Sequence, residues 1–385
     1  MREAENISIM PGSKTKNMSP LPSSLRTLID QVQAAATSRA PLQIRGSGSK
    51  DFYGGHCHGG LMDMRPHAGI TQYDPTELVI TARAGTPMAD INDALAQKGQ
   101  YLPFDPPSFG PQSTVGGMVA AGLAGPARAS VGGVRDYVLG ATLLNGKGEL
   151  LTFGGQVMKN VAGYDISRLL AGSMGVLGAL CEVSLKVLPV PVASTTLRVE
   201  MTQIQALRVF SQWSSQPAPL HAGVWWDDTL AVWLRGAAAA VEATAQRLVQ
   251  EVRADVVDPD FAASFWSGLR DHRDEFFQQA YAAVQTGATL WRVSVPQVAA
   301  PLLVSGEQLI EWGGAQRWIC TTAPAAQLRQ AAREAGGHAT LFHGQDKSPG
   351  VFEPLGAPLD RIHRQLKLAF DPSGIFNRGR LYPDL

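Results

Sequence analysis

Residues 107–117 read Pro-Ser-Phe-Gly-Pro-Gln-Ser-Thr-Val-Gly-Gly, and they continue into a run of small residues that ends at Gly125. Ser113 and Thr114 can cap a helix that begins near residue 115. Gly116 and Gly117 have no Cβ, so the backbone there can lie directly against a flat ligand or a phosphate. A stretch this rich in glycine and alanine buries too little apolar area to form a core by itself. We therefore predict that it forms a wall of a cofactor site.

A change in composition divides the chain near residue 190. Of the 40 glycines, 26 precede this point, whereas all 8 tryptophans lie between Trp213 and Trp318. The glycine-rich first part lets the backbone come close to a ligand or to another segment, whereas the tryptophan-rich middle part is suited to the packing of bulky side chains. Two prolines within residues 188–192 mark the boundary, because proline ends a strand.

A chain of 385 residues with 45% hydrophobic content can bury two cores. We expect a first domain at residues 21–190 and a second at 191–369. Residues 1–20 are expected to form a flexible tail, and residues 370–385 to fold back on the first domain.

Charge and cysteine content exclude several classes of function. The formal net charge is zero, so there is no basic field to attract nucleic acid or an anionic membrane. Cys57, Cys181 and Cys320 lie far apart without a CxxC pair, which argues against a disulfide framework, a zinc site and an iron–sulfur cluster. No apolar run reaches membrane-spanning length, and residues 7–10 are too short for a signal peptide. We expect a cytoplasmic protein without a metal site, peripheral to a membrane only through partners.

Periodicity and turn residues predict an α+β fold. In the first part we expect a helix capped by Ser23 and Ser24, a helix at 88–98, and a hairpin turning at Asn145-Gly146; the strands expected there are 42–45, 61–64, 77–82, 138–144, 150–153 and 179–187. In the second part we expect strands at 195–201, 223–226, 230–234 and 290–295, and helices at 203–213, 237–252, 261–277 and 325–335. Trp225 and Trp226 place one ring on each face of a strand, so one ring can meet the first domain or another subunit.

The segment Arg45-Gly-Ser-Gly-Ser-Lys50 directly follows an expected strand. Consecutive backbone N–H groups in such a loop form an anion-binding nest that suits a pyrophosphate. An ordinary glycine turn is the alternative. Neither a GxGxxG after a strand and before a long helix nor a GxxxxGK[ST] occurs, so the Rossmann and P-loop fingerprints are excluded.

Five glycine-bearing motifs occur in a fixed order. They are the loop 45–50, the stretch 107–117, Gly-Gly-Val-Arg-Asp-Tyr-Val-Leu-Gly at 132–140, Lys-Asn-Val-Ala-Gly-Tyr-Asp at 159–165, and Gly-Ser-Met-Gly-Val-Leu-Gly at 172–178. In this order they resemble the FAD-binding domain of the vanillyl-alcohol oxidase / p-cresol methylhydroxylase (PCMH) type over residues 21–190. The closing Phe-Asp-Pro…Phe-Asn-Arg-Gly-Arg at 370–380 resembles the Asp-Pro…Asn-Pro-Gly signature of that family. The resemblance implies a two-subdomain FAD-binding domain followed by a smaller α+β cap of antiparallel sheet and helices.

The resemblance also implies a set of FAD-binding residues. The pyrophosphate would be held by the loop residues Arg45, Gly46, Ser47, Gly48, Ser49 and Lys50. The flavin and its tail would be lined by Pro107, Ser113, Thr114, Gly116, Gly117 and Met118. Backbone contacts would come from Gly163, Ser173, Gly175, Gly178 and Ala179. Members with a histidyl-linked flavin carry histidine where Ser49 stands, so the FAD is expected to be noncovalent. Met174 replaces an acidic residue of the family pattern, and Arg378 replaces a proline.

Residues 163–178 look closest to the glycolate oxidase / D-lactate dehydrogenase branch, and the short cap is most similar to the smaller FAD-binding subunit of bacterial glycolate oxidase. This implies a complex with a larger flavin subunit and an iron–sulfur subunit that oxidises glycolate to glyoxylate. Two alternatives remain: a flavin relay or assembly subunit, and a stand-alone D-lactate or other 2-hydroxy-acid dehydrogenase.

Oxidation of a 2-hydroxy acid needs a cation for the carboxylate and a base for the hydroxyl proton. Arg292, within an apolar strand, is the first candidate for the cation, and a solvent-facing strand residue is its alternative. Arg270 is a second candidate, with a solvated helix face as the alternative. His338 and His343 are candidates for the base, with a structural role as the alternative.

The larger relatives carry a metal motif His-x-Gly-Asp-Gly-Asn-x-x-His, but the sequence here is Phe-His-Gly-Gln-Asp at 342–346, which lacks the second ligand.

Overall fold

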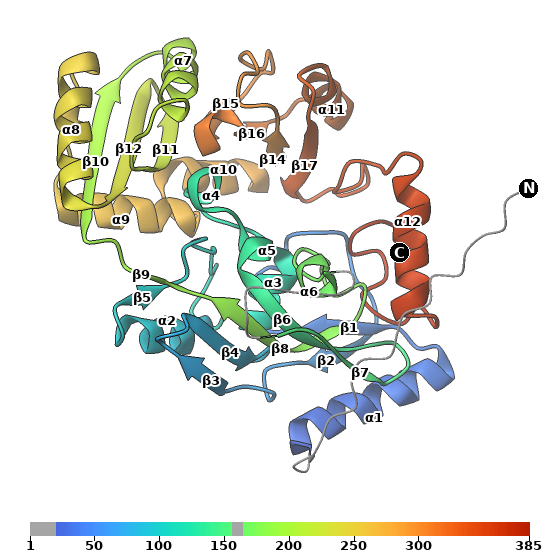
Figure 1. The fold of residues 1–385 in the computed structure, drawn as a ribbon. Helices are drawn as coiled ribbons and strands as arrows, with labels where there is room; N and C mark the ends of the chain where they lie inside the picture. The colour runs from blue at the N-terminus through green and yellow to red at the C-terminus, as the bar shows by residue number, and fades with distance from the viewer. Residues whose placement is uncertain (1–20, 156–164) are drawn as a thin grey trace, which may run out of the picture.

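A five-stranded and an eight-stranded sheet organise the computed structural model, which describes residues 21–155 and 165–385 (Figure 1). The smaller sheet has the order β3-β4-β8-β6-β7, and the larger has the order β13-β10-β12-β11-β15-β16-β14-β17. Both sheets are antiparallel throughout their paired strands, and helices cover their faces. The α+β class predicted from the sequence is confirmed.

The first half of the chain is built around the five-stranded sheet. Its elements are α1 (Ser23–Ser38), β1 (Leu42–Arg45), β2 (Gly60–Asp63), β3 (Ile70–Asp74), β4 (Val79–Arg83), α2 (Met88–Ala96), β5 (Gln100–Tyr101), α3 (Val115–Ala121), α4 (Arg128–Val131), α5 (Val134–Tyr137), β6 (Val138–Leu144), β7 (Leu150–Gly154), α6 (Ile166–Leu169), β8 (Ala179–Lys186) and β9 (Leu188–Pro189). β6 and β7 form the hairpin expected at Asn145-Gly146. The core of this half joins α1, α2 and α3 to β4, β6 and β8.

β1 and β2 form a separate parallel pair beside this core. The C-terminal segment joins that pair, because Phe376 forms a parallel bridge with Leu42. Both residues belong to the first hydrophobic core. The two ends of the described chain are therefore packed together.

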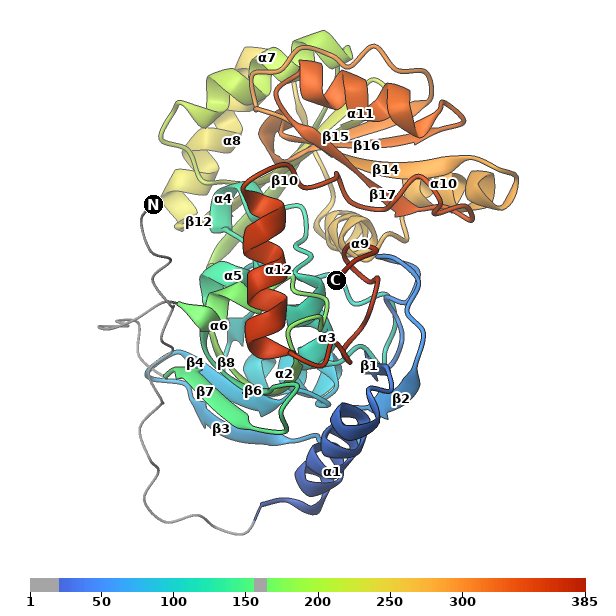
Figure 2. The same cartoon turned by 90° about the vertical axis from the view of Figure 1, so that its right-hand side faces the viewer.

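The second half, which we call the cap, is built on the eight-stranded sheet. Its elements are β10 (Ala193–Glu200), α7 (Gln203–Ser214), β11 (Leu220–Trp226), β12 (Thr229–Gly236), α8 (Ala238–Val252), β13 (Asp255–Val256), α9 (Pro259–Arg270), α10 (Glu275–Gln285), β14 (Thr289–Ser294), β15 (Glu307–Glu311), β16 (Gln316–Thr321), α11 (Ala325–Glu334) and β17 (His338–His343). Helices α7, α8 and α11 cover the outer face of the sheet, and α9 and α10 lie on the inner face (Figures 1 and 2). The inner face is the one that meets the first half of the chain.

The last helix, α12 (Leu359–Phe370), stands against the first half beside α5 and α6 (Figure 2). Its buried Lys367 forms a 2.7 Å ion pair with Asp371, whose side chain is fully buried. The carboxylate of Asp371 also accepts hydrogen bonds from the backbone N–H groups of Ile375 and Phe376. The Lys367 ammonium donates to the carbonyl oxygens of Val176 and Phe376. These bonds fix the C-terminal segment, which follows α12 and which we also call the closing segment, against the first half of the chain.

Two expectations for individual elements are wrong, and one strand was not predicted. Ser23 and Ser24 do not cap α1, because Pro22 stands at the N-cap and the Ser24 hydroxyl bonds to His67 instead. One expected helix at 261–277 is two helices, since His272 has a φ of 54° and Asp274 caps a new helix by accepting a hydrogen bond from the N–H of Phe277. β3 was not expected, because its outward residues show little apolar alternation.

Candidate functional site: a cradle at the end of the first strand

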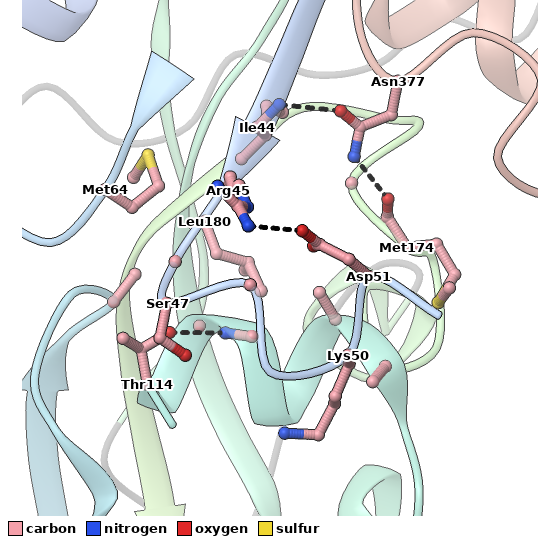
Figure 3. Close-up of a pocket in the computed structure, with 18 of the residues that line it drawn as sticks. Ile44, Arg45, Ser47, Lys50, Asp51, Met64, Thr114, Met174, Leu180 and Asn377 are labelled. Atoms are coloured by element: carbon pink, nitrogen blue, oxygen red, sulfur yellow. Dashed lines mark hydrogen bonds and ion pairs between the residues drawn. The ribbon is translucent and has the colours of Figure 1, made fainter. Parts of the chain in front are cut away.

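A cavity of about 850 Å³, including its open mouth, lies where the loop after β1 meets α3 and the C-terminal segment (Figure 3). We call it the cradle. Its walls come from the segments 43–51, 113–121 and 174–180, together with residues that reach it from elsewhere, namely Cys57, Met64, Ala84, Asn377 and Arg380. Segments far apart in the sequence thus meet in one hollow.

The loop after β1 forms one side of the cradle through its main chain. A Cβ on Gly46 would lie 2.3 Å from Oγ1 of Thr114, so only glycine allows this approach to α3. Gly48 has a φ of +82°, in the left-handed region that favours glycine. The N–H groups of Gly46, Ser47 and Gly48 donate to no acceptor among the described residues. These donors form the kind of nest that binds an anion.

Helix α3 forms the facing wall. Thr114 stands at its N-cap and accepts a 3.3 Å hydrogen bond from the N–H of Gly117, as the sequence predicts. A Cβ on Gly116 would lie 2.6 Å from the Cβ of Ala84, so the helix can rest directly on the end of β4. The missing side chains therefore bring the backbone of α3 close to the cavity.

Lys50 is the buried cation of the cradle. Its ammonium donates a 2.9 Å hydrogen bond to Oγ of Ser113 and a longer one to the carbonyl oxygen of Ser108. Burial lowers the pKa of Lys50 to about 8, and the nearby carboxylate of Asp271 opposes that shift. With a pKa of about 8, the Lys50 side chain changes from charged to neutral just above neutral pH.

Arg45 and Asp51 form a 2.6 Å ion pair at the edge of the cradle (Figure 3). Both side chains are about two-fifths exposed, so water screens the pair and it contributes little to stability.

The C-terminal segment completes the cradle. The side-chain oxygen of Asn377 accepts from the N–H of Ile44 at 2.8 Å, and its nitrogen donates to the carbonyl oxygen of Met174 at 2.7 Å (Figure 3). Arg380 donates to the carbonyl oxygens of Lys50 and Gly55. Asn377 thereby joins the first strand to the loop before β8, and Arg380 holds the loop that follows β1.

The structure brings together most of the residues that the resemblance implies for FAD. Twelve of them line the cradle: Arg45, Gly46, Ser47, Gly48, Ser49, Lys50, Ser113, Thr114, Gly116, Gly117, Gly175 and Gly178. Pro107, Met118, Ser173 and Ala179 are buried near these segments but are not among the lining residues. Gly163 lies outside the described residues, as does the expected tail at 1–20.

Sequence reasoning missed other lining residues, among them Met64, Ala84, Leu180, Asn377 and Arg380. The first three are apolar residues in or next to strands, where only the tertiary fold decides which face meets the cavity. Asn377 and Arg380 stand within the closing signature, so the resemblance could have directed attention to them.

The candidate catalytic residues lie in the cap and do not line the cradle. Arg292, on β14, donates a 3.2 Å hydrogen bond to the hydroxyl of Tyr53, three residues after Lys50. His338 begins β17 and is exposed, whereas His343 ends it half-buried, with its Nδ1 unpartnered among the described residues. Burial lowers the pKa of both histidines. Arg270 is committed to ion pairs with Asp105 and Asp271, so the solvated alternative for it is wrong.

Aromatic rings fill the region between the cradle and the cap. We call this set the aromatic cluster: Phe52 and Phe109 from the first half, and His272, Phe277, Trp318 and Phe342 from the cap. The ring contacts within it span 3.6 to 6.3 Å between centroids, the closest being the stacked pair His272 and Phe277. Burial lowers the pKa of His272 to about 3, so its ring is neutral. The cluster begins beside Lys50, whose nitrogen is 5.7 Å from the Phe109 ring centre.

The described part of the chain contains neither a cluster of metal-ligating side chains nor a membrane-spanning helix. Within residues 21–155 and 165–385, no three His, Cys, Asp or Glu side chains are grouped so that they could bind a metal ion. No helix in these ranges combines the length and the apolar character needed to cross a membrane.

Comparison with known proteins defines the class of this fold and site. Residues 20–154 match the family model described as FAD binding domain. The solved structure of an alkyldihydroxyacetonephosphate synthase superposes on 92% of this chain and 74% of its own, with a TM-score of 0.65 at 15% identity, which shows a shared fold. The chain therefore has an FAD-binding domain of the PCMH type with an antiparallel cap.

The particular family follows from sequence relatives. The glycolate oxidase subunit GlcE of Escherichia coli is 47% identical over 360 residues, which cover 94% of this chain and 98% of the relative. The glycolate oxidase subunit GlcD of Bacillus subtilis is 36% identical over 171 residues, but these cover only 44% of this chain and 36% of the relative. The chain belongs to the family of the glycolate oxidase subunit GlcE.

Proposed function

We propose that this chain binds FAD noncovalently in the cradle, as the smaller flavin subunit of a complex that oxidises glycolate to glyoxylate. The observation that carries the proposal is the set of free backbone donors in the loop 46–48, which faces α3 at glycine-only distances. Such donors suit a diphosphate, and the family match supplies the identity of the dinucleotide. Ser49 offers no imidazole for a covalent link.

The complex would contain a larger flavin subunit, which the partial match to subunit GlcD supports. It would also contain an iron–sulfur subunit, as the resemblance of the sequence implies. FAD, when bound, supplies a hydride acceptor for C2 of the hydroxy acid. Within this chain, Arg292 would hold the substrate carboxylate, and His338 or His343, both neutral, would accept the hydroxyl proton.

The aromatic cluster favours a second candidate function. Rings of this cluster pack against Lys50 of the cradle and, through Phe342, against Tyr53, the hydrogen-bond partner of Arg292. A substrate held at Arg292 would have to reach the flavin past these rings. In this reading the flavin of this chain relays electrons or stabilises the assembly, and the partner flavin subunit oxidises the substrate. The stand-alone dehydrogenase remains a third reading.

Turnover distinguishes these readings. The purified chain, its larger partner and the whole complex are assayed with glycolate, with D-lactate and with an artificial electron acceptor. Activity of the chain alone supports its own substrate site, and with D-lactate it supports the third reading. Activity that needs the partner, combined with full FAD occupancy here, supports a relay or assembly role. An Arg292→Ala complex with an unchanged KM for glycolate would remove Arg292 as the carboxylate anchor.

We expect FAD to protect Cys57 from alkylation. Cys57 lines the cradle and is half-buried, whereas Cys181 and Cys320 are buried in the two halves. Labelling of the apoprotein by N-ethylmaleimide, followed by peptide mass spectrometry, should slow at Cys57 when FAD is added. Cys57→Ser is the control for the assignment. Equal labelling with and without saturating FAD would place the cofactor elsewhere.

FAD affinity should fall as the pH rises above 8. The pKa of Lys50 lies at about 8, so its ammonium is charged below that pH and neutral above it. Loss of one charge-assisted contact to an anionic cofactor weakens binding by about tenfold. Fluorescence titrations between pH 7 and 9.5 should show this fall in the natural chain and a flat, weak profile in Lys50→Met. The same pH slope in both proteins would exclude Lys50 as its cause.

A further inference from the structure

A second cavity lies wholly within the cap, and its lining comes from the inner face of the sheet, from α9 and from the start of α10. It measures about 1,590 Å³ including its open mouth, and we call it the cap groove. Its floor is apolar and buried, and consists of Val224, Ala231, Leu269 and Leu309. None of its lining residues belongs to the cradle.

The mouth of the cap groove exposes large apolar side chains. Phe261, on α9, lines the groove and is 65% exposed. The half-buried side chains of Phe265 and Val257 line the groove with it. Single exposed apolar residues are ordinary, but a cluster at the mouth of an apolar hollow is typical of an interaction surface.

Trp226 also lines the groove, and its indole N–H has no acceptor among the described residues. Neighbouring indoles are paired: Trp225 donates to the carbonyl oxygen of Met201, and Trp266 donates to the hydroxyl of Thr196. An unpaired buried donor costs about 1–3 kcal/mol. A bound segment that offers a backbone carbonyl would remove that cost.

The rim of the groove carries excess negative charge. Asp227, Asp274 and Glu275 line it, and none of them forms an ion pair among the described residues. The two cations of the lining, Arg198 and Arg273, are each engaged by a carboxylate, at 3.7 and 3.2 Å. Because the whole chain has a net charge of zero, this local excess marks a surface suited to a positively charged partner.

We propose that the cap groove docks a basic amphipathic segment of a partner subunit, with an apolar anchor against Phe261 and Trp226 and flanking Lys or Arg at the acidic rim. The proposal rests on the proposed function in taking this chain to be a subunit of a complex. A second copy of the chain is a poor occupant, because a symmetric contact at this site would bring two acidic rims together. Of the two neighbouring tryptophans, Trp226 is the one whose ring lines the groove, so in this proposal its ring meets another subunit.

The test measures binding of the holo chain to its co-expressed larger flavin subunit by biolayer interferometry. Phe261→Ser and the double variant Asp227→Lys/Glu275→Lys should each weaken the affinity at least tenfold, since anchors of this kind carry most of the binding energy. Added salt should weaken the natural pair but not the charge variant. Val298→Ser, at another exposed apolar position, is the control and should bind as the natural chain does.

The outcomes separate this inference from the proposed function. Unchanged affinity in both groove variants, with FAD content retained, overturns the docking site and leaves the proposed function standing. A natural chain that binds FAD but no partner subunit contradicts the proposed function itself. Light scattering that shows a dimer of the chain, split by Phe261→Ser, would overturn the inference in favour of a second copy. Circular dichroism on each variant confirms that it is folded.

Discussion

Replacing Gly46 with valine should leave the chain folded but unable to retain FAD. The new Cβ would lie 2.3 Å from Oγ1 of Thr114 and would separate the loop after β1 from α3. The branched side chain would also cover the free N–H groups of the loop. Because several charge-assisted hydrogen bonds are lost together, we expect FAD affinity to fall at least about 100-fold, equivalent to about 2.7 kcal/mol. Isothermal titration of the apoprotein measures the change.

Gly356→Val provides the matched control, since a Cβ at Gly356 meets no atom within 4 Å. It should bind FAD as the natural chain does. Gly46→Ala gives a smaller insertion at the same place and should show an intermediate loss. Gly46→Val with natural affinity and a natural melting temperature would contradict the placement of the cofactor in the cradle.

Replacing Asp371 with alanine should cause the largest loss of stability among single changes in the closing segment. It would leave the ammonium of Lys367 buried without its carboxylate, and the N–H groups of Ile375 and Phe376 without an acceptor. Removal of one partner from a buried ion pair costs about 3–5 kcal/mol. Urea unfolding measures the free energy.

Two comparisons isolate the cause of that loss. Asp384→Ala breaks the exposed pair with Arg364 and should cost at most about 1 kcal/mol. The double variant Lys367→Met/Asp371→Ala removes both charges and should be more stable than Asp371→Ala alone. A loss below about 1 kcal/mol for Asp371→Ala would show that the closing segment is not held by this pair.

Local sequence signals predicted the parts of the site that local chemistry decides. Thr114 caps α3 as expected, because a threonine before Val-Gly-Gly has the right side chain at the right place. The turn at Asn145-Gly146 forms for the same kind of reason. The α+β class followed from periodicity and turn residues, and the type of FAD-binding domain followed from the resemblance that the five glycine motifs carry.

Parts that depend on distant contacts could not be predicted in this way. Asn377 bonds to Ile44 across 333 residues, and no local pattern records that pairing. Arg292 meets the hydroxyl of Tyr53 only because the cap lies over the first half. The break at His272 has a local signal in Asp274, but the apolar helical period across 261–277 concealed it.

The most direct test of the central claim is the flavin content of the chain, measured by absorption before and after acid precipitation. The account predicts one FAD per chain, fully released into the supernatant, and its loss from Gly46→Val but not from Gly356→Val. A chain that carries no flavin when expressed with its partner subunits, or one that retains flavin in the acid pellet, would contradict it.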